Sequence, residues 1–271
     1  MPRAAPAAIR KCSAPHAGFC RLNAVHLSPH TARPVNTRPR TSAFTLIELL
    51  VVIAIIGILA GITLRVLGRN RELANRAVCL SNMRQIHSLA SRFAADNDGA
   101  LPIGYRLGQK QFNTTLYTPV TEYVLLGKLL AGANPPDARV FFCPSEHDTT
   151  QAYNTKDNPW PVKAGTNLQG GYGTNPLVDW AGATFPDSPI RITNIGRIPL
   201  IADGVGLPKR VDSRHKDGVN VVFSDGSGAW VPREKFDADL AGCTAPSPSN
   251  NAAQDRIWQI LGGQDPNQAQ P

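Results

Sequence analysis

His215 and three aspartates are the residues whose types and spacing come nearest to a reactive or metal-binding site. Asp217 and Asp225 follow the histidine, and Asp203 precedes it. An imidazole beside carboxylates can bind a metal or act as a general base. The alternative is structural, with His215 and Asp225 fixing the two ends of a strand and its turn. We favour the structural interpretation, because no pair of ligands has helical or zinc-like spacing.

Other motifs that carry chemistry are incomplete. The run Asp96-Asn97-Asp98-Gly99 begins like a calcium loop, but the downstream acidic ligand of an EF-hand is missing. The glycines at 170, 171 and 173 lack the Lys-Ser/Thr of a phosphate loop. Neither a Gly-x-Ser-x-Gly motif nor a Cys–His nucleophile arrangement stands out. We therefore expect no catalytic activity and no resident cofactor.

The cysteines predict one covalent link. Cys12 and Cys20 lie in the first 43 residues, which leaves Cys79, Cys143 and Cys243. An odd number outside the cytosol suggests one bridge and one free thiol. Cys79 falls in a predicted helix, and Cys143 falls in a strand or loop expected to pack over it. We predict a Cys79–Cys143 disulfide, which would stabilise the fold by ~4 kcal/mol on the chain-entropy model, and a free Cys243.

These residues are organised around one apolar stretch, residues 44–64. It is long enough to cross a bilayer, which takes about 20 residues, and its thirteen Leu, Ile or Val contribute about −4 to −8 kcal/mol to insertion. Its one charge is Glu48, which is either an acid at the border of an anchor or a group that finds a partner when helices assemble. Gly57 and Gly61 allow close helix packing, although glycine is also common in membrane helices.

The helical pattern continues beyond the apolar stretch. No proline occurs from Phe44 to Leu101, and Asn97-Asp98-Gly99 followed by Pro102 ends the pattern. We predict one helix from about Phe44 to Asp96, roughly 80 Å long at ~1.5 Å per residue. Its later half has a predicted apolar face and a predicted polar face. The apolar face is Leu73, Ala77, Leu80, Met83, Ile86, Ala90 and Phe93, and the polar face is Arg69, Glu72, Arg76, Arg84, Gln85 and Arg92.

The rest of the chain reads as short strands between turn signals, so the expected fold class is α+β. Val219–Ser224 and Ala229–Val231 form the clearest predicted hairpin. We predict a long N-terminal helix, its first half transmembrane, packed on a small antiparallel sheet with a loop-rich C-terminal region. The predicted segments are a basic leader (1–43), a transmembrane helix (44–67), its amphipathic continuation (68–98), a β domain (99–236) and a flexible tail (237–271), in which Asp255–Leu261 forms a short docking helix at most.

The segment from Ser42 to Ala60 resembles the processing motif of type IV pilins and type II secretion pseudopilins. The resemblance implies cleavage by prepilin peptidase between Ala43 and Phe44, followed by N-methylation of Phe44. It also implies that Glu48 neutralises the N-terminal amine of a neighbouring subunit in a filament. A buried ammonium and a buried carboxylate are each costly alone and tolerable together. Ala43 departs from the pattern, because the family usually has Gly before the cut.

A second part of the resemblance lies beyond the anchor. A subgroup of pilin-like proteins has a Cys-x-x-Asn-Leu-Arg-Gln-Ile-like helix, here beginning at Cys79, and a Cys-Pro-Ser, here beginning at Cys143. It ends with a His, nine residues and Asp-Gly, found here as His215 with Asp225 and Gly226. Major pseudopilins can bind calcium in a C-terminal loop, which leaves a Ca²⁺ site near Asp203, Asp217 or Asp225 open.

The resemblance implies a structural subunit of a type II secretion pseudopilus or a type IV pilus-like filament. Its partners would be prepilin peptidase, other pilin or pseudopilin subunits, the inner-membrane assembly platform and, before assembly, membrane lipid. The alternatives are a membrane-tethered binding or envelope protein that never polymerises, and a periplasmic hydrolase with a polar pocket at His215.

The net charge of +8 does not indicate nucleic-acid binding. Of the 28 Lys and Arg residues, seven lie in residues 1–43 without any Asp or Glu, so the rest has 21 basic against 20 acidic residues. A basic footprint for phosphate is therefore missing. The leader charge instead predicts a single-pass protein of the bacterial inner membrane, with its N-terminus cytoplasmic and its C-terminal domain periplasmic before it enters a periplasmic or extracellular filament.

Overall fold

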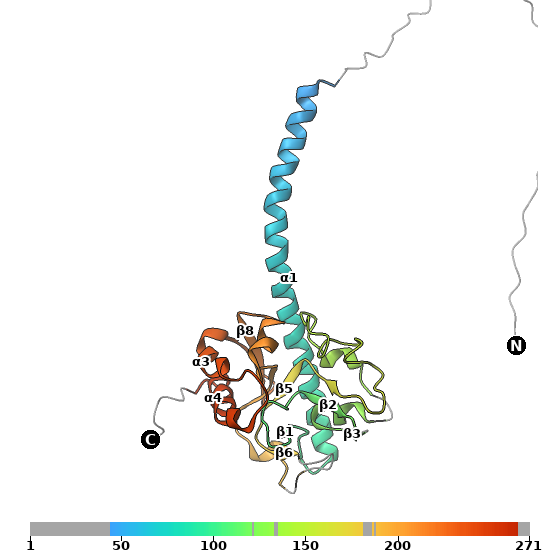
Figure 1. The fold of residues 1–271 in the computed structure, drawn as a ribbon, viewed down its shortest axis with the longest axis vertical. Helices are drawn as coiled ribbons and strands as arrows, with labels where there is room; N and C mark the ends of the chain where they lie inside the picture. Colours follow the sequence, from blue (N-terminus) through green and yellow to red (C-terminus); the bar gives the residue numbers. More distant parts are fainter. Residues whose placement is uncertain (1–43, 121, 133–134, 181–185, 187, 265–271) are drawn as a thin grey trace, which may run out of the picture. The chain divides into compact units, whose positions relative to one another are not determined.

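The structure, a computed structural model, describes residues 44–120, 122–132, 135–180, 186 and 188–264, without the side chains of 64–69 (Figure 1). The predicted leader, including Ala43, lies outside the described residues. The chain divides into two compact units, Met1–Val52 and Ile53–Pro271. Within the second unit the fold is α+β, which confirms the predicted class and is consistent with a pilin-like fold.

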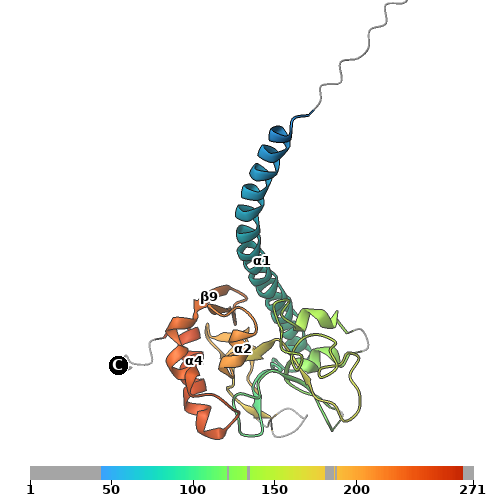
Figure 2. The same cartoon turned by 45° about the horizontal axis from the view of Figure 1, so that its top comes forward.

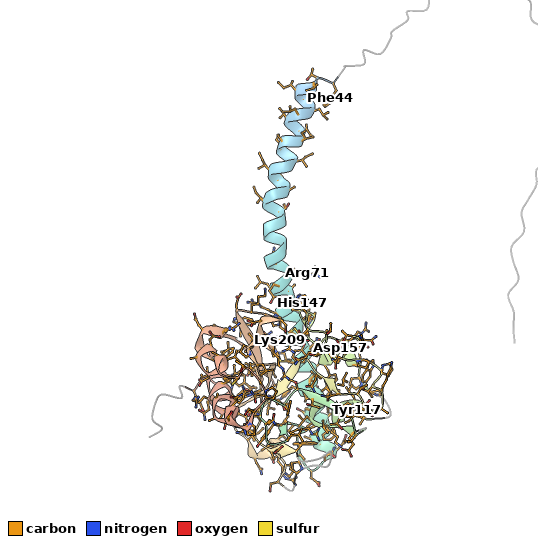
Figure 3. All side chains as sticks on the ribbon, viewed as in Figure 1. Phe44, Arg71, Tyr117, His147, Asp157 and Lys209 are labelled. Atoms are coloured by element: carbon orange, nitrogen blue, oxygen red, sulfur yellow. The ribbon has the colours of Figure 1, made fainter. Side chains whose placement is uncertain are left out.

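Helix α1 runs from Leu46 to Asp96, as the absence of proline and the Asn97-Asp98-Gly99 turn predicted. Its segment Leu46–Thr63 is long and apolar enough to cross a membrane. The large apolar side chains of this segment are 45–80 % exposed and project from the helix (Figure 3). An apolar surface of this size needs lipid or other protein to cover it.

Among the described residues, three small sheets follow α1. One pairs β1 with β6, the second has the order β3-β2-β4, and the third has the order β5-β7-β8-β9. The strands are β1 (Tyr105–Arg106), β2 (Thr115–Thr118), β3 (Glu122–Tyr123), β4 (Leu168–Gln169), β5 (Tyr172–Thr174), β6 (Asp179–Trp180), β7 (Pro199–Asp203), β8 (Gly218–Phe223) and β9 (Gly228–Pro232). Short 3-10 helices are η1 (Leu125–Leu130), η2 (Ala138–Phe141), η3 (Ile192–Asn194), η4 (Arg233–Lys235) and η5 (Pro248–Asn250), and the later α-helices are α2 (Pro208–Asp212), α3 (Asp237–Ala241) and α4 (Asn251–Leu261).

The four-stranded sheet is antiparallel and contains the predicted hairpin. Strands β8 and β9 pair with Val219 opposite Val231 and Val221 opposite Ala229. All six residues of β8 are buried, because α1 and the C-terminal helices cover the two faces of this sheet (Figure 2). The sheet therefore places the end of β7 and the loop before β8 next to α1.

The face of α1 that packs on the sheet matches the predicted one at Met83, Ile86 and Ala90, which are buried, and differs towards the N-terminal end of this half. There Cys79, which was not assigned to that face, is fully buried, whereas Leu73 is 52 % exposed. Glu72 and Arg76, assigned to the polar face, turn inward, where Glu72 contacts His215 and Arg76 contacts Trp230. Polarity alone misplaced these two positions, because Glu72 pairs with the buried His215 and Arg76 pairs with Asp217 as well as with Trp230.

The prediction of a flexible tail is wrong for residues 237–263, apart from the short docking helix allowed for at Asp255–Leu261. Residues 237–263 fold back onto a second core cluster with α3 and α4, in which Leu240, Ile257, Trp258 and Leu261 are buried. Trp258 alone supplies a large apolar area at this contact. Only residues 265–271 of the predicted tail lie outside the described residues.

One glycine in this fold carries a testable packing constraint. A Cβ on Gly171 would lie 2.5 Å from the backbone nitrogen of Cys143. We expect Gly171→Ala to lower the free energy of unfolding by about 1–3 kcal/mol, because a backbone contact cannot move aside. Urea denaturation of the detergent-solubilised chain measures this. Gly196→Ala is the matched control, since a Cβ there meets nothing within 4 Å, and equal stability of the two variants would contradict the constraint.

Candidate functional site

The N-terminus of α1 is capped by reciprocal hydrogen bonds between Thr45 and Glu48. The backbone N–H and the hydroxyl of Thr45 each donate to Glu48 Oε2 at 2.8 Å, and the backbone N–H of Glu48 donates to the Thr45 hydroxyl at 3.3 Å. This is a capping box, in which two otherwise unpaired donors at a helix start are satisfied by each other's side chains. Glu48 is exposed, so its carboxylate is also open to a group from outside the chain.

This cap was not predicted, although the sequence contains a signal for it. Thr45-x-x-Glu48 directly before an apolar run is the pattern of a capping box. Phe44 precedes the helix and is 75 % exposed. Glu48 therefore has a local role in starting α1 in addition to the assembly role that the resemblance implies.

The two glycines of the apolar segment leave open surface. A Cβ at Gly57 or Gly61 would meet nothing within 4 Å. They occupy one face of the helix, four residues apart, so another helix can approach closely there. Their role in assembly stays a prediction.

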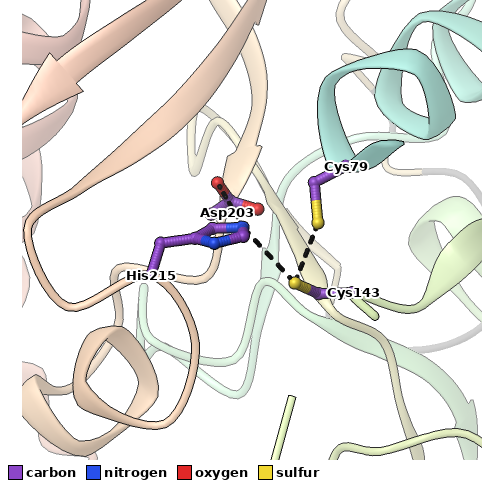
Figure 4. Close-up of side chains that lie close together, drawn as sticks. All are labelled: Cys79, Cys143, Asp203 and His215. Carbon is purple, nitrogen blue, oxygen red and sulfur yellow. Dashed lines mark hydrogen bonds and ion pairs between the residues drawn. The ribbon is translucent and has the colours of Figure 1, made fainter. Parts of the chain in front are cut away.

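A second group of functional side chains lies inside the domain (Figure 4). It brings together Cys79 from α1, Cys143 after η2, Asp203 at the end of β7 and His215 after α2. Their ligand atoms all lie within 4.8 Å of one another, and all four residues are buried. The Sγ atoms of the two cysteines are 2.8 Å apart, and His215 Nε2 is 3.4 Å from Cys143 Sγ and 3.7 Å from Asp203 Oδ2.

Helix α1 supplies a further acid that orients the imidazole. His215 Nδ1 lies 2.6 Å from Glu72 Oε1. Glu72 is itself held by Arg76 Nε at 3.1 Å and by the hydroxyl of Ser145 at 3.0 Å. Neither Glu72 nor Cys79 was grouped with His215 in the sequence analysis, because residues of α1 and of the C-terminal half meet only after folding.

Burial and mutual contacts shift the pKa values of these groups. Burial raises the pKa of Asp203, although His215 and the backbone N–H of Asn220 oppose it. Burial also raises the pKa of the Cys143 thiol, and the contact with Cys79 adds to this. Burial works against a charged His215, but its contacts with Cys143, Asp203 and Glu72 prevail and raise its pKa to about 9.

The structure separates the three aspartates considered with His215. Asp217 is exposed and pairs with Arg76 at 3.1 Å. Asp225 caps its own turn by accepting from the backbone N–H of Ser227 at 2.9 Å. Only Asp203 belongs to the buried group. The three therefore do not form one calcium site, and Asp225 has the structural turn role that was predicted for it.

The two cysteines that were predicted to pair are neighbours, but no bond joins them. Cys79 and Cys143 lie side by side as thiols, and Cys243 is a separate buried thiol. Gln254 is among the neighbours of Cys243, with its Nε2 3.5 Å from the sulfur. The Cys79–Cys143 disulfide stays a prediction.

A buried ion pair fixes the loop that carries Cys143. Arg214 Nε lies 2.5 Å from Glu146 Oε2, and each side chain is 1 % exposed. Gln151 from the same loop also contacts Arg214. Because Arg214 precedes His215 directly, this pair holds the cysteine loop and the histidine loop together.

Comparison with protein families bears on the first of these two sites. The model of the prokaryotic N-terminal methylation motif matches residues 38–64. The chain is prepilin-like. The match covers the residues around Phe44, the cap at Glu48 and the apolar segment of α1, and it indicates a prepilin-peptidase substrate and a membrane-anchored protein. Comparison with curated proteins gave no match, and neither did comparison with solved structures.

Proposed function

We propose that this prepilin-like protein is a structural subunit of a type II secretion pseudopilus or type IV pilus-like filament. Prepilin peptidase cuts between Ala43 and Phe44, Phe44 is methylated, and α1 leaves the lipid to pack against the α1 helices of other subunits. The observation that carries the proposal is the methylation motif over 38–64, whose residues 46–63 lie on a helix with exposed apolar side chains.

The charge of Glu48 gives assembly its specificity in this proposal. Its carboxylate meets the Phe44 amine of a neighbouring subunit, and the pair stabilises both charges in an apolar filament core. Gly57 and Gly61 allow the close approach of helices there. The seven basic residues of 1–43 favour a cytoplasmic N-terminus before cleavage, which leaves the folded domain on the periplasmic side.

A non-enzymatic role fits the interior site. The order Glu72, His215 and Cys143 resembles the acid, base and nucleophile of a catalytic triad. However, the His215 side chain is 1 % exposed and Cys143 is 5 % exposed. A substrate would have to enter the packed interior between α1 and the sheet to reach the sulfur, so we propose that the chain has no catalytic activity.

Processing is the first test. Mass spectrometry of the chain isolated from host membranes is expected to find an N-terminus at methylated Phe44. Ala43→Gly restores the residue usual in the family and should be cut at least as fast, whereas Ala43→Glu should leave the precursor uncut. A membrane-bound chain that retains residues 1–43 in a host with active prepilin peptidase would contradict the proposed function.

A further inference from the structure

The four buried groups around Cys143 have the composition of a metal centre. They offer two sulfurs, one imidazole nitrogen and one carboxylate oxygen, and they come from four separate parts of the fold (Figure 4). Thiolate and imidazole ligands in a four-membered set are typical of Zn²⁺. Calcium requires six to eight oxygen ligands, which this group does not offer.

The imidazole is oriented as in a metal-bound histidine. With Nδ1 directed at Glu72 Oε1 at 2.6 Å, Nε2 is directed at Cys143 and Asp203. Histidines that bind zinc usually donate their other ring N–H to a carboxylate or carbonyl, which fixes the ring and its tautomer. Glu72, held by Arg76 and Ser145, is such a carboxylate.

The carboxylate of Asp203 independently indicates that a bound cation belongs at this site. Its Oδ2 accepts from the backbone N–H of Asn220 at 2.7 Å and from the Asn220 side chain at 3.1 Å. Its Oδ1 is buried and has no hydrogen-bond partner in the described part of the chain. A buried carboxylate oxygen without a partner is costly, and a cation would remove that cost.

The spacing of the groups fits a tetrahedral ion with one adjustment. Zinc–ligand bonds of about 2.0–2.3 Å give ligand–ligand edges of about 3.3–3.8 Å. The separation of His215 Nε2 from Cys143 Sγ is 3.4 Å, and 3.7 Å separates it from Asp203 Oδ2, the second oxygen of the carboxylate whose Oδ1 lacks a partner. The two sulfurs, 2.8 Å apart, would move about 1 Å further apart around the ion.

We propose that Cys79, Cys143, Asp203 and His215 bind one structural Zn²⁺ ion, with Glu72 positioning the histidine. The ion ties α1 to β7 and to the two loops that carry Cys143 and His215. A closed, buried site of four protein ligands leaves no open position for a substrate, so its role is to stabilise the fold. The same thiols cannot form a disulfide while they bind the ion, so this proposal replaces the Cys79–Cys143 disulfide predicted from the sequence.

The test uses the full chain, extracted in detergent without reductant or chelator. Elemental analysis is expected to find about one Zn²⁺ per chain. Replacing it with Co²⁺ should give the visible absorption of a tetrahedral, thiolate-bound ion. Removing the ion with a chelator should lower the melting temperature, and adding Zn²⁺ should restore it.

Variants assign the ligands. Cys143→Ser and Asp203→Asn should lose the bound zinc, whereas Cys243→Ser, which changes a buried thiol outside the group, should retain it. Glu72→Gln should weaken zinc binding about 10–100-fold while the stoichiometry stays at one ion, as expected for a residue that acts through the histidine.

Measurements on the wild-type chain test the proposal even if a variant fails to fold. A Cys79–Cys143 disulfide in the chain as isolated, found by non-reducing mass mapping, would overturn the proposal. Failure of the reduced, metal-depleted wild-type chain to bind Co²⁺ or Zn²⁺ would also overturn it. Neither outcome affects the proposed filament function, which is tested at Phe44 and Glu48.

Discussion

Replacing Glu48 with glutamine is expected to abolish filament assembly while leaving α1 and its membrane insertion intact. Glutamine can take the place of glutamate in a capping box, so Thr45 keeps its partner. The charge is lost, however, and the incoming ammonium of Phe44 is left unpaired in an apolar core. Removing one partner of a buried pair costs about 3–5 kcal/mol, which corresponds to at least about a hundredfold weaker association per subunit.

Glutamine and leucine at position 48 separate the two roles of this residue. Glu48→Leu removes both the cap and the charge, whereas Glu48→Gln removes only the charge. Assembly is measured by cross-linking between subunits through Leu46→Cys, with sheared filaments counted by electron microscopy. Full assembly of the Gln variant would show that Glu48 serves only to start the helix, and a processed wild-type chain that never cross-links would favour a tethered binding protein instead.

Glu146→Gln is expected to destabilise the domain by about 3–5 kcal/mol. The substitution keeps the shape of the side chain but removes the carboxylate that is paired with the buried Arg214. Arg210 increases the cost, because it is buried nearby and its pKa is already lowered to about 10 by burial and by the charge of Arg214. The loop that carries Cys143 should loosen together with the ion pair.

Chemical denaturation of the solubilised chain measures this loss. Asp137→Asn is the matched control, because its ion pair with Arg139 lies on the surface, where such pairs contribute little; no measurable change is expected. The double variant Glu146→Leu with Arg214→Met should recover part of the stability, since it removes both charges. Wild-type stability of Glu146→Gln would contradict this account of the pair.

Local signals in the sequence were sufficient for the elements with strong periodicity. The extent of α1 followed from the absence of proline and from the Asn97-Asp98-Gly99 stop, and the β8–β9 hairpin followed from two strand-like segments on either side of a glycine-containing turn. Of the C-terminal packing, only a short docking helix over Asp255–Leu261 was allowed for, because α4 has only a narrow apolar stripe, formed by Ile257, Trp258 and Leu261, in a segment rich in Ala, Pro, Asn and Gln. Such a stripe predicts a helix but not the surface it covers.

The interior site was predictable only in part. The proximity of Cys79 and Cys143 could be predicted, because it required only that the loop carrying Cys143 pack over α1. Joining His215 to Glu72 required knowledge of a long-range contact that no local spacing contains. The polar residues of α1 were assigned to solvent because their partners lie 70 or more positions further along the chain.

The position of the cap at Thr45 has a consequence for maturation. The regular helix begins at Leu46, so the peptide bond before Phe44 precedes the first helical turn. A protease can therefore take up that bond in extended form without unwinding any turn of α1. In the proposed function, the new terminus is produced beside a helix end whose geometry is already set, and we expect the cut chain to dock without refolding.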